Sequence, residues 1–294
     1  MKAAPFRYER PRSLEEALQL LRDPEAKALA GGQSLVPMMA MRLARPRTLV
    51  DLGHVEGLAG IQEQDGELIT GAMVRQRSLE RRHGLASKVP LVAAALPHVG
   101  HREIRNRGTV GGSIAHADPA AELGLVAATL RARIQARGAD GSREIAAEEL
   151  VTGPFSTTLA SEELLTAVRW PTARPGEGFA FAEVARRHGD FALCGAAIHV
   201  RRGEQRIELA RVGLLGVGAV PVVYDVAHQL GESGSEQRIA DVAHELAERI
   251  EPGSDMHASA GYRRRLVRVL VTRCLTRAVA EATPADGSAG GARD

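Results

Sequence analysis

The fold is decided by Leu29-Ala30-Gly31-Gly32-Gln33-Ser34-Leu35, a glycine loop between two patterned segments. Before the loop, residues 27–30 form a short apolar piece typical of a strand. After it, residues 35–43 have the pattern of a helix and residues 48–52 that of another strand. Glycine has no Cβ, so the backbone N–H groups of such a loop can approach a negatively charged ligand closely. This order predicts a small α+β unit with an anion site at its loop.

A second glycine loop of matching chemistry is Thr109-Val110-Gly111-Gly112-Ser113. A polar, arginine-rich stretch over residues 100–108 precedes it. After it we expect a helix opened by Asp118 as N-cap and Pro119 at its first position. Neither loop has the lysine of a P-loop or the spacing of a Rossmann fingerprint. A lone Gly-Gly pair is usually only a tight turn. Because two loops of matching chemistry each lead into a helix, the residues themselves predict an anionic, dinucleotide-like ligand between the two loops.

The remaining patterns fill in an α+β chain. Ser13 and Glu16 form a capping box ahead of a helical stripe, and residues 85–99 are mostly helical in pattern. Strands are expected at residues 68–72 and 164–170, with a hairpin between residues 131 and 145. Residues 171–178, rich in proline and glycine, are the expected domain boundary. Beyond it we expect a three-stranded meander over residues 179–187, 191–201 and 206–217, then helices. The last helix, residues 262–280, would place on one face Tyr262, Leu266, Leu270 and Cys274.

Composition narrows the class of protein. The 294 residues are 44% hydrophobic and 25% charged, as in a globular chain of about two domains. A net charge of +2 and an aromatic content of 3% give no basis for nucleic-acid binding. Two cysteines, Cys194 and Cys274, cannot supply a four-cysteine iron–sulfur or zinc site. We expect Cys194 to be buried and inert. The scarcity of cysteine fits a reducing, cytoplasmic location, and no apolar run is long enough to span a membrane.

The histidines do not form a convincing chemical site. His98 and His101 are three residues apart, and His116 lies two residues before Asp118. A metal site needs three or four converging ligands, so we expect none here. A His116–Asp118 acid/base pair is conceivable, but a polar loop is the favoured interpretation.

Four motifs, in order, resemble those of the FAD-binding medium subunits of molybdenum hydroxylases. That family includes carbon monoxide dehydrogenase and the bacterial xanthine, nicotine and quinoline dehydrogenases. The matching stretches are residues 29–39, residues 109–122, residues 185–193, and Asp255 with residues 257–259 and 262–264. The resemblance implies the FAD-binding fold of the vanillyl-alcohol oxidase type, with two α+β sub-domains. They would be followed by a C-terminal domain with a three-stranded antiparallel sheet and helices. The expected divisions are residues 1–57, 58–175 and 176–282, with a disordered tail at 283–294.

The resemblance also implies the cofactor-binding residues. The two loops would hold the FAD pyrophosphate from both sides, and the helix near Pro119 would aim its positive end at that charge. Glu122 would meet a cofactor hydroxyl, although a first-turn glutamate can also simply stabilise the helix. The full set is Leu29, Ala30, Gly31, Gly32, Gln33, Ser34, Leu35, Thr109, Val110, Gly111, Gly112, Ser113, Asp118, Glu122, Leu165 and Phe191.

Two of these assignments have competing interpretations, and one nearby position departs from the family. Leu165 would lie near the adenine, and it can equally be a buried strand leucine. Phe191 would bring its ring near the isoalloxazine, against the alternative of a core phenylalanine. The family often has lysine where this chain has Glu183, so Arg186 or Arg187 could supply the positive charge instead.

The function implied is that of an electron-transfer subunit without a catalytic side chain. It would receive electrons from the two [2Fe-2S] clusters of a small subunit, within a dimer of heterotrimers. A large subunit would carry the molybdenum–pterin, and the external acceptor would be NAD, a quinone or oxygen. Two alternatives stay open: a stand-alone flavoenzyme of the same fold, and a non-catalytic nucleotide-binding module. The hydroxylated substrate is not encoded in this chain.

Overall fold

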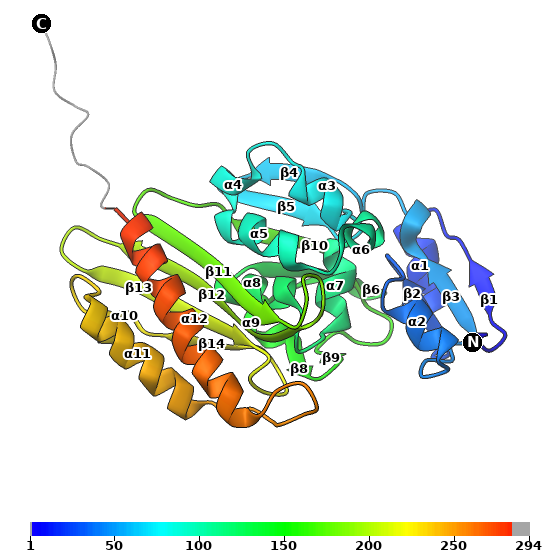
Figure 1. Ribbon diagram of the computed structural model, residues 1–294. Coiled ribbons are helices and arrows are strands. Elements are labelled where there is room, and N and C mark those ends of the chain that lie inside the picture. Colours follow the sequence, from blue (N-terminus) through cyan, green and yellow to red (C-terminus); the bar gives the residue numbers. More distant parts are fainter. Residues whose placement is uncertain (1, 284–294) are drawn as a thin grey trace, which may run out of the picture.

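The computed structural model describes residues 2–283, and Figure 1 shows their arrangement. The first sheet has the order β1-β3-β2, with parallel pairs. Its strands are β1 (Arg7–Glu9), β2 (Ala26–Leu29) and β3 (Thr48–Asp51), with helices α1 (Leu14–Leu21) and α2 (Leu35–Ala40) and the 3₁₀ turn η1 (Leu52–His54). The predicted N-cap of α1 is confirmed, because Ser13 Oγ accepts from the N–H of Glu16 at 3.1 Å, although Glu16 Oε2 accepts from the N–H of Arg12 rather than that of Ser13. The predicted order of strand, loop, helix and strand is confirmed as well.

The second sheet is antiparallel, with the order β4-β5-β10-β6-β7. Its strands are β4 (Ile61–Gln64), β5 (Glu67–Gly71), β6 (Arg133–Gly138), β7 (Gly141–Ala146) and β10 (Leu164–Pro171). In its centre Trp170 is completely buried, and its indole Nε1 donates to Thr70 Oγ1 at 2.9 Å. The accompanying elements are α3 (Gln76–Glu80), α4 (Leu85–Lys88), α5 (Pro90–Ala95), η2 (Leu96–His98), α6 (Arg102–Arg107), α7 (Val110–His116), α8 (Glu122–Thr129), α9 (Ala147–Leu150), β8 (Val151–Gly153) and β9 (Ser156–Thr157).

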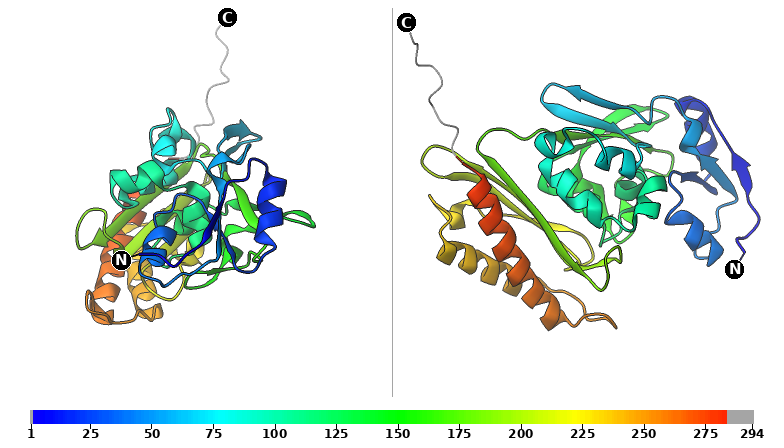
Figure 2. Two further views of the ribbon diagram at one scale, coloured as in Figure 1. Left: turned by 90° about the vertical axis from the view of Figure 1, so that its right-hand side faces the viewer. Right: turned by 45° about the horizontal axis from the view of Figure 1, so that its top comes forward.

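The third sheet, β11-β12-β13-β14, is antiparallel and follows the predicted boundary segment. It comprises β11 (Glu177–Ala185), β12 (Ala192–Arg202), β13 (Ile207–Leu215) and β14 (Val222–Asp225), with α10 (Ala227–Leu230), α11 (Glu236–Arg249) and α12 (Ala260–Glu281). Alternate residues of β11 serve two cores, since Phe179 and Phe181 join the central core while Ala180 joins that of α11 and α12. Figure 2 shows α11 and α12 on the face away from the central helices.

The α+β class is confirmed, and one count in it is wrong. The C-terminal sheet has four antiparallel strands rather than three. The fourth, β14, follows a glycine- and proline-containing segment over residues 216–221 and pairs with β13 from Leu214↔Val222 to Arg211↔Asp225. A strand of four residues with half-exposed side chains has too little alternation to be read from sequence.

Three helix predictions also need correction. The polar stretch over residues 100–108 contains α6, whose buried Arg105 pairs with Glu80 instead of an apolar stripe. Asp118 does not cap a helix, because its Oδ1 accepts from the N–H of Ala120 at 2.9 Å and α8 begins at Glu122. The predicted apolar face of α12 is only partly buried, since Leu270 and Cys274 are buried whereas Tyr262 is 37% exposed. The expected tail falls almost entirely on residues 284–294, outside the described residues.

Candidate functional site

The first glycine loop lies directly against the chain that leads into the second. A Cβ added to Gly31 would stand 2.5 Å from the carbonyl oxygen of Arg107 and 2.8 Å from the Cα of Gly108. Both contacts are with backbone, so no side-chain movement could relieve them. Gly32 has a φ of +73°, in the left-handed region that favours glycine. The two positions therefore require glycine for different reasons: Gly31 lets the loop approach the Arg107–Gly108 backbone closely, and Gly32 allows the left-handed turn.

The second motif is the start of a helix rather than a loop. Thr109 is the N-cap of α7, and its Oγ1 accepts from the N–H of Gly112 at 3.1 Å. A Cβ on Gly111 would lie 2.5 Å from the Cβ of Ala72, so this glycine seats the helix on the segment after β5. A Cβ on Gly112 would lie 3.1 Å from the Cβ of Ala30. The two predicted motifs are thus neighbours in space.

The motifs differ in what their amides can offer a ligand. Within residues 2–283, no hydrogen bond is donated by the N–H groups of Gly31, Gly32, Gln33, Ser34 or Leu35. In the second motif, by contrast, Val110 and Gly111 donate to Val74 and Ala72, and Ser113 donates to Thr109. A run of unengaged amides at the start of α2 is a surface suited to an anion. The second motif contributes its hydroxyl groups and the close approach at Gly112.

Positive charge stands beside the first loop. Arg75 donates through Nη1 to the carbonyl oxygen of Arg107, the same oxygen that limits Gly31. Burial and the charge of Arg107 lower the pKa of the Arg75 guanidinium. Two guanidinium groups held close together favour a negatively charged partner. No motif in the sequence indicates this pair, because Arg75 lies far from either glycine motif along the chain.

The other predicted site residues have distinct settings. Glu122 is 6% exposed in the first turn of α8, and burial raises the pKa of its carboxyl group to about 7. Leu165 is a buried strand leucine in β10. Phe191 is 75% exposed and precedes β12, so the interpretation of a core phenylalanine in a strand is wrong. Asp118 lies in the turn before α8.

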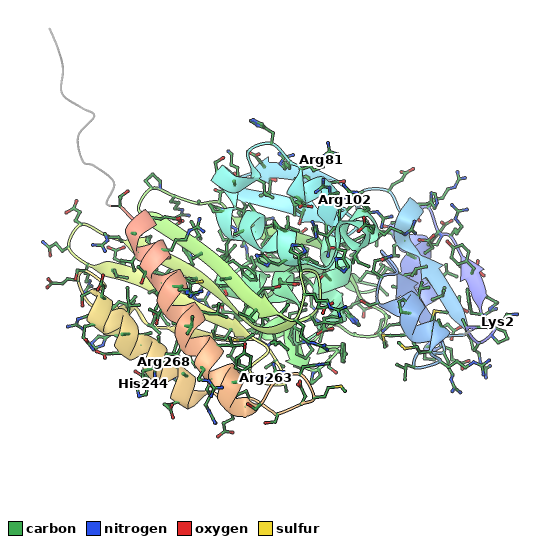
Figure 3. All side chains as sticks on the ribbon, viewed as in Figure 1. Lys2, Arg81, Arg102, His244, Arg263 and Arg268 are labelled. Carbon is green, nitrogen blue, oxygen red and sulfur yellow. The ribbon has the colours of Figure 1, made fainter. Side chains whose placement is uncertain are left out.

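The segments around Phe191 are anchored by Arg263, labelled near the start of α12 in Figure 3. Its guanidinium donates to the carbonyl oxygens of Leu193 and Gly216, at 2.9 Å for the latter, and pairs with Asp255 at 2.7 Å. Nη1 of Arg186 lies 3.1 Å from Nδ1 of His257. The predicted third and fourth motifs therefore meet here. Arg263 is buried on an otherwise apolar helix face, and these hydrogen bonds and the ion pair with Asp255 compensate for the burial of its charge.

The histidines and cysteines are placed as follows. His98 Nδ1 lies 3.5 Å from Glu183 Oε1, and the ring of His116 lies 5.1 Å from that of Phe155. Cys194 is fully buried, as predicted, and burial raises the pKa of its thiol to about 12. Across residues 2–283 no group of three His, Cys, Asp or Glu side chains could hold a metal, and no helix could span a membrane.

Free amides beside two close glycine contacts and an arginine side chain form a surface suited to an anionic ligand within an α+β fold. The same chain matches the family model described as the FAD binding domain in molybdopterin dehydrogenase over residues 4–173. It matches the CO dehydrogenase flavoprotein C-terminal domain over residues 179–278. The chain belongs to this family of FAD-binding oxidoreductase subunits, which confirms the resemblance in the four motifs.

Individual relatives agree over nearly the whole chain. The nicotine 6-hydroxylase medium subunit of Paenarthrobacter nicotinovorans is 40% identical, covering 95% of this chain and 99% of the relative. The 6-hydroxypseudooxynicotine dehydrogenase complex subunit alpha of the same organism is 39% identical, covering 97% and 98%. Among solved structures, a chain of the carbon monoxide dehydrogenase from Hydrogenophaga pseudoflava superimposes with a TM-score of 0.92. It is 30% identical, with 96% of this chain and 100% of that chain covered.

Proposed function

We propose that the diphosphate of FAD is bound by the unengaged amides of residues 31–35, with Gly112 and the hydroxyl groups of Thr109 and Ser113 opposite. The main support for this proposal is that these unengaged amides adjoin Gly112, where an added Cβ would lie 3.1 Å from the Cβ of Ala30. The FAD diphosphate fits this geometry, because a dianionic group can accept from several N–H donors at once. The remaining proposed contacts are Leu29, Ala30, Val110, Gly111, Asp118, Glu122, Leu165 and Phe191.

We further propose that the chain is the electron-transfer subunit of a molybdenum hydroxylase. When bound, FAD supplies the capacity to accept and release electrons, and the residues of this chain hold it and set its electrostatic surroundings. Phe191 supports this assignment, because an aromatic ring 75% exposed beside an anchored loop is available for a flavin ring or a partner chain. Electrons would come from the [2Fe-2S] clusters of a small subunit and leave to NAD, a quinone or oxygen.

The proposed assembly is a dimer of heterotrimers in the cytoplasm, with molybdenum–pterin on the large subunit. It is tested by purifying the chain from its native source and recording both the visible spectrum and the co-purifying chains. Flavin absorption with two partner chains, one of them with iron–sulfur absorption, is the expected result. A flavin-containing chain without partners would favour a stand-alone flavoenzyme. A colourless chain that does not bind added FAD would refute the cofactor site itself.

A further inference from the structure

Three titratable side chains from separate elements influence one another electrostatically: His98 and Glu183 form a pair, and the buried Glu122 is close enough to feel the charge of both. Glu122 comes from α8, His98 from η2 and Glu183 from β11. His98 Nδ1 and Glu183 Oε1 are 3.5 Å apart, and the side chain of Glu183 is only 4% exposed. Glu122 is 6% exposed. We call this group the Glu122–His98–Glu183 cluster.

The cluster is not electrically balanced. It has two carboxyl groups and one imidazole, and one oxygen of Glu183, Oε2, is buried without a hydrogen-bond partner among the described residues. The side chain of Glu122 has no hydrogen bond to another described residue. Two carboxylates that influence each other in a buried place resist ionising together. A buried carboxyl group without a cationic hydrogen-bond partner, such as that of Glu122, therefore favours its protonated form.

The charges facing the cluster act on Glu122 and His98 in both directions. Burial, Glu183 and Asp118 raise the pKa of Glu122, while His98 lowers it. For His98, Glu183 and Glu122 raise the pKa, while burial and Arg105 lower it. The ring of Phe181 lies 5.2 Å from that of His98 and closes the cluster on the sheet side. A carboxyl pKa of about 7 allows a change in the charge around Glu122 to alter its protonation near neutral pH.

We propose that Glu122, within the Glu122–His98–Glu183 cluster, takes up a proton when FAD binds, so that cofactor binding and protonation are coupled. This inference rests on the proposed function, which places FAD beside Glu122. The diphosphate brings negative charge toward a cluster that already has more carboxyl groups than cations, and this favours the protonated form. A protonated Glu122 can donate a hydrogen bond to the cofactor, whereas the carboxylate can only accept one.

The test is calorimetric titration of the flavin-free full chain with FAD, repeated in buffers of different ionisation enthalpy. The dependence of the apparent enthalpy on the buffer gives the number of protons taken up. We expect an uptake of up to about one proton per FAD near neutral pH. Glu122→Gln keeps the side-chain shape and hydrogen-bonding groups but cannot titrate, so it should bind FAD with no proton uptake.

Two charge variants give opposite predictions. Glu183→Gln removes a negative neighbour, so the pH of greatest uptake should fall. His98→Gln removes a positive neighbour, so that pH should rise. Thermal unfolding of each variant checks that the chain remains folded. The matched control is His199→Gln in β12, whose ring nitrogen lies 3.3 Å from Glu177 in a similar pair within the same sheet. It should leave proton uptake unchanged.

FAD binding without proton uptake at any pH between about 6 and 9 would overturn this inference and leave the FAD site intact. A shift in the same direction for Glu183→Gln and His98→Gln would overturn it as well. No FAD binding at all would instead refute the proposed function.

Discussion

Gly31→Ala tests whether contact between the two motifs shapes the cofactor site. The added Cβ would stand 2.5 Å from the carbonyl oxygen of Arg107, whereas ordinary contact begins at 3.4 Å. The loop and the Arg107–Gly108 backbone must therefore separate by roughly 0.9 Å, and overpacking of this kind costs about 1–3 kcal/mol. Without FAD the loop can relax outward, so most of the cost should appear in binding. FAD affinity should fall about 5- to 150-fold.

The assay is equilibrium dialysis of FAD against the flavin-free chain, with thermal unfolding of the same sample as a measure of folding. Gly60→Ala is the matched control, because a Cβ there meets no atom within 4 Å. It should leave both affinity and unfolding temperature unchanged. If Gly31→Ala binds FAD as tightly as the unmodified chain, the close approach of the two motifs does not determine the site. If Gly31→Ala lowers the unfolding temperature but leaves the affinity for FAD unchanged, the contact is purely structural.

Three other substitutions or treatments address separate features. Gly32→Asp should abolish FAD retention, because its carboxylate would occupy the amides that the diphosphate needs. Gly32→Asn tolerates the same left-handed backbone without the charge, so it should retain more flavin. Flavin absorbance per chain measures both variants, and equal retention would contradict the mechanism. Gly124→Ala should stabilise the chain by about 0.5–1 kcal/mol, because it lies within α8 with no atom within 4 Å of an added Cβ; an unchanged or lower unfolding midpoint would refute this. Cys194 and Cys274 should react with a thiol reagent only on unfolding, since burial raises their thiol pKa values to about 12 and about 11; rapid labelling of the folded chain would show that they are accessible.

Sequence reasoning succeeded where a local signal and the tertiary structure agree. The capping hydrogen bond from Glu16 to Ser13 and the strand–loop–helix order around Gly31 are such cases. The prediction that Asp118 caps a helix was wrong because an aspartate before proline can form either of two local structures. It can cap a helix, or it can accept from an N–H two residues on, as it does with Ala120. Only the packing of α8 decides between them.

The geometry of the site was predictable only in part. Both glycine pairs were found, but the sequence does not show that the second lies inside a helix whose amides are already engaged. Arg75 carries no motif and reaches the first loop through the fold alone. The imbalance around Glu183 was equally hidden, because η2, α8 and β11 meet only in three dimensions.

Trp170 has a practical consequence. It is the only tryptophan in the chain, and it is completely buried in the middle of the central sheet with its indole bonded to Thr70. Its fluorescence therefore comes from one known place in an apolar environment and should emit at short wavelength. Flavins absorb where tryptophan emits, so cofactor loading should quench this emission through energy transfer, whereas unfolding should move it to longer wavelength. One intrinsic fluorophore thus distinguishes loss of flavin from loss of structure without any label.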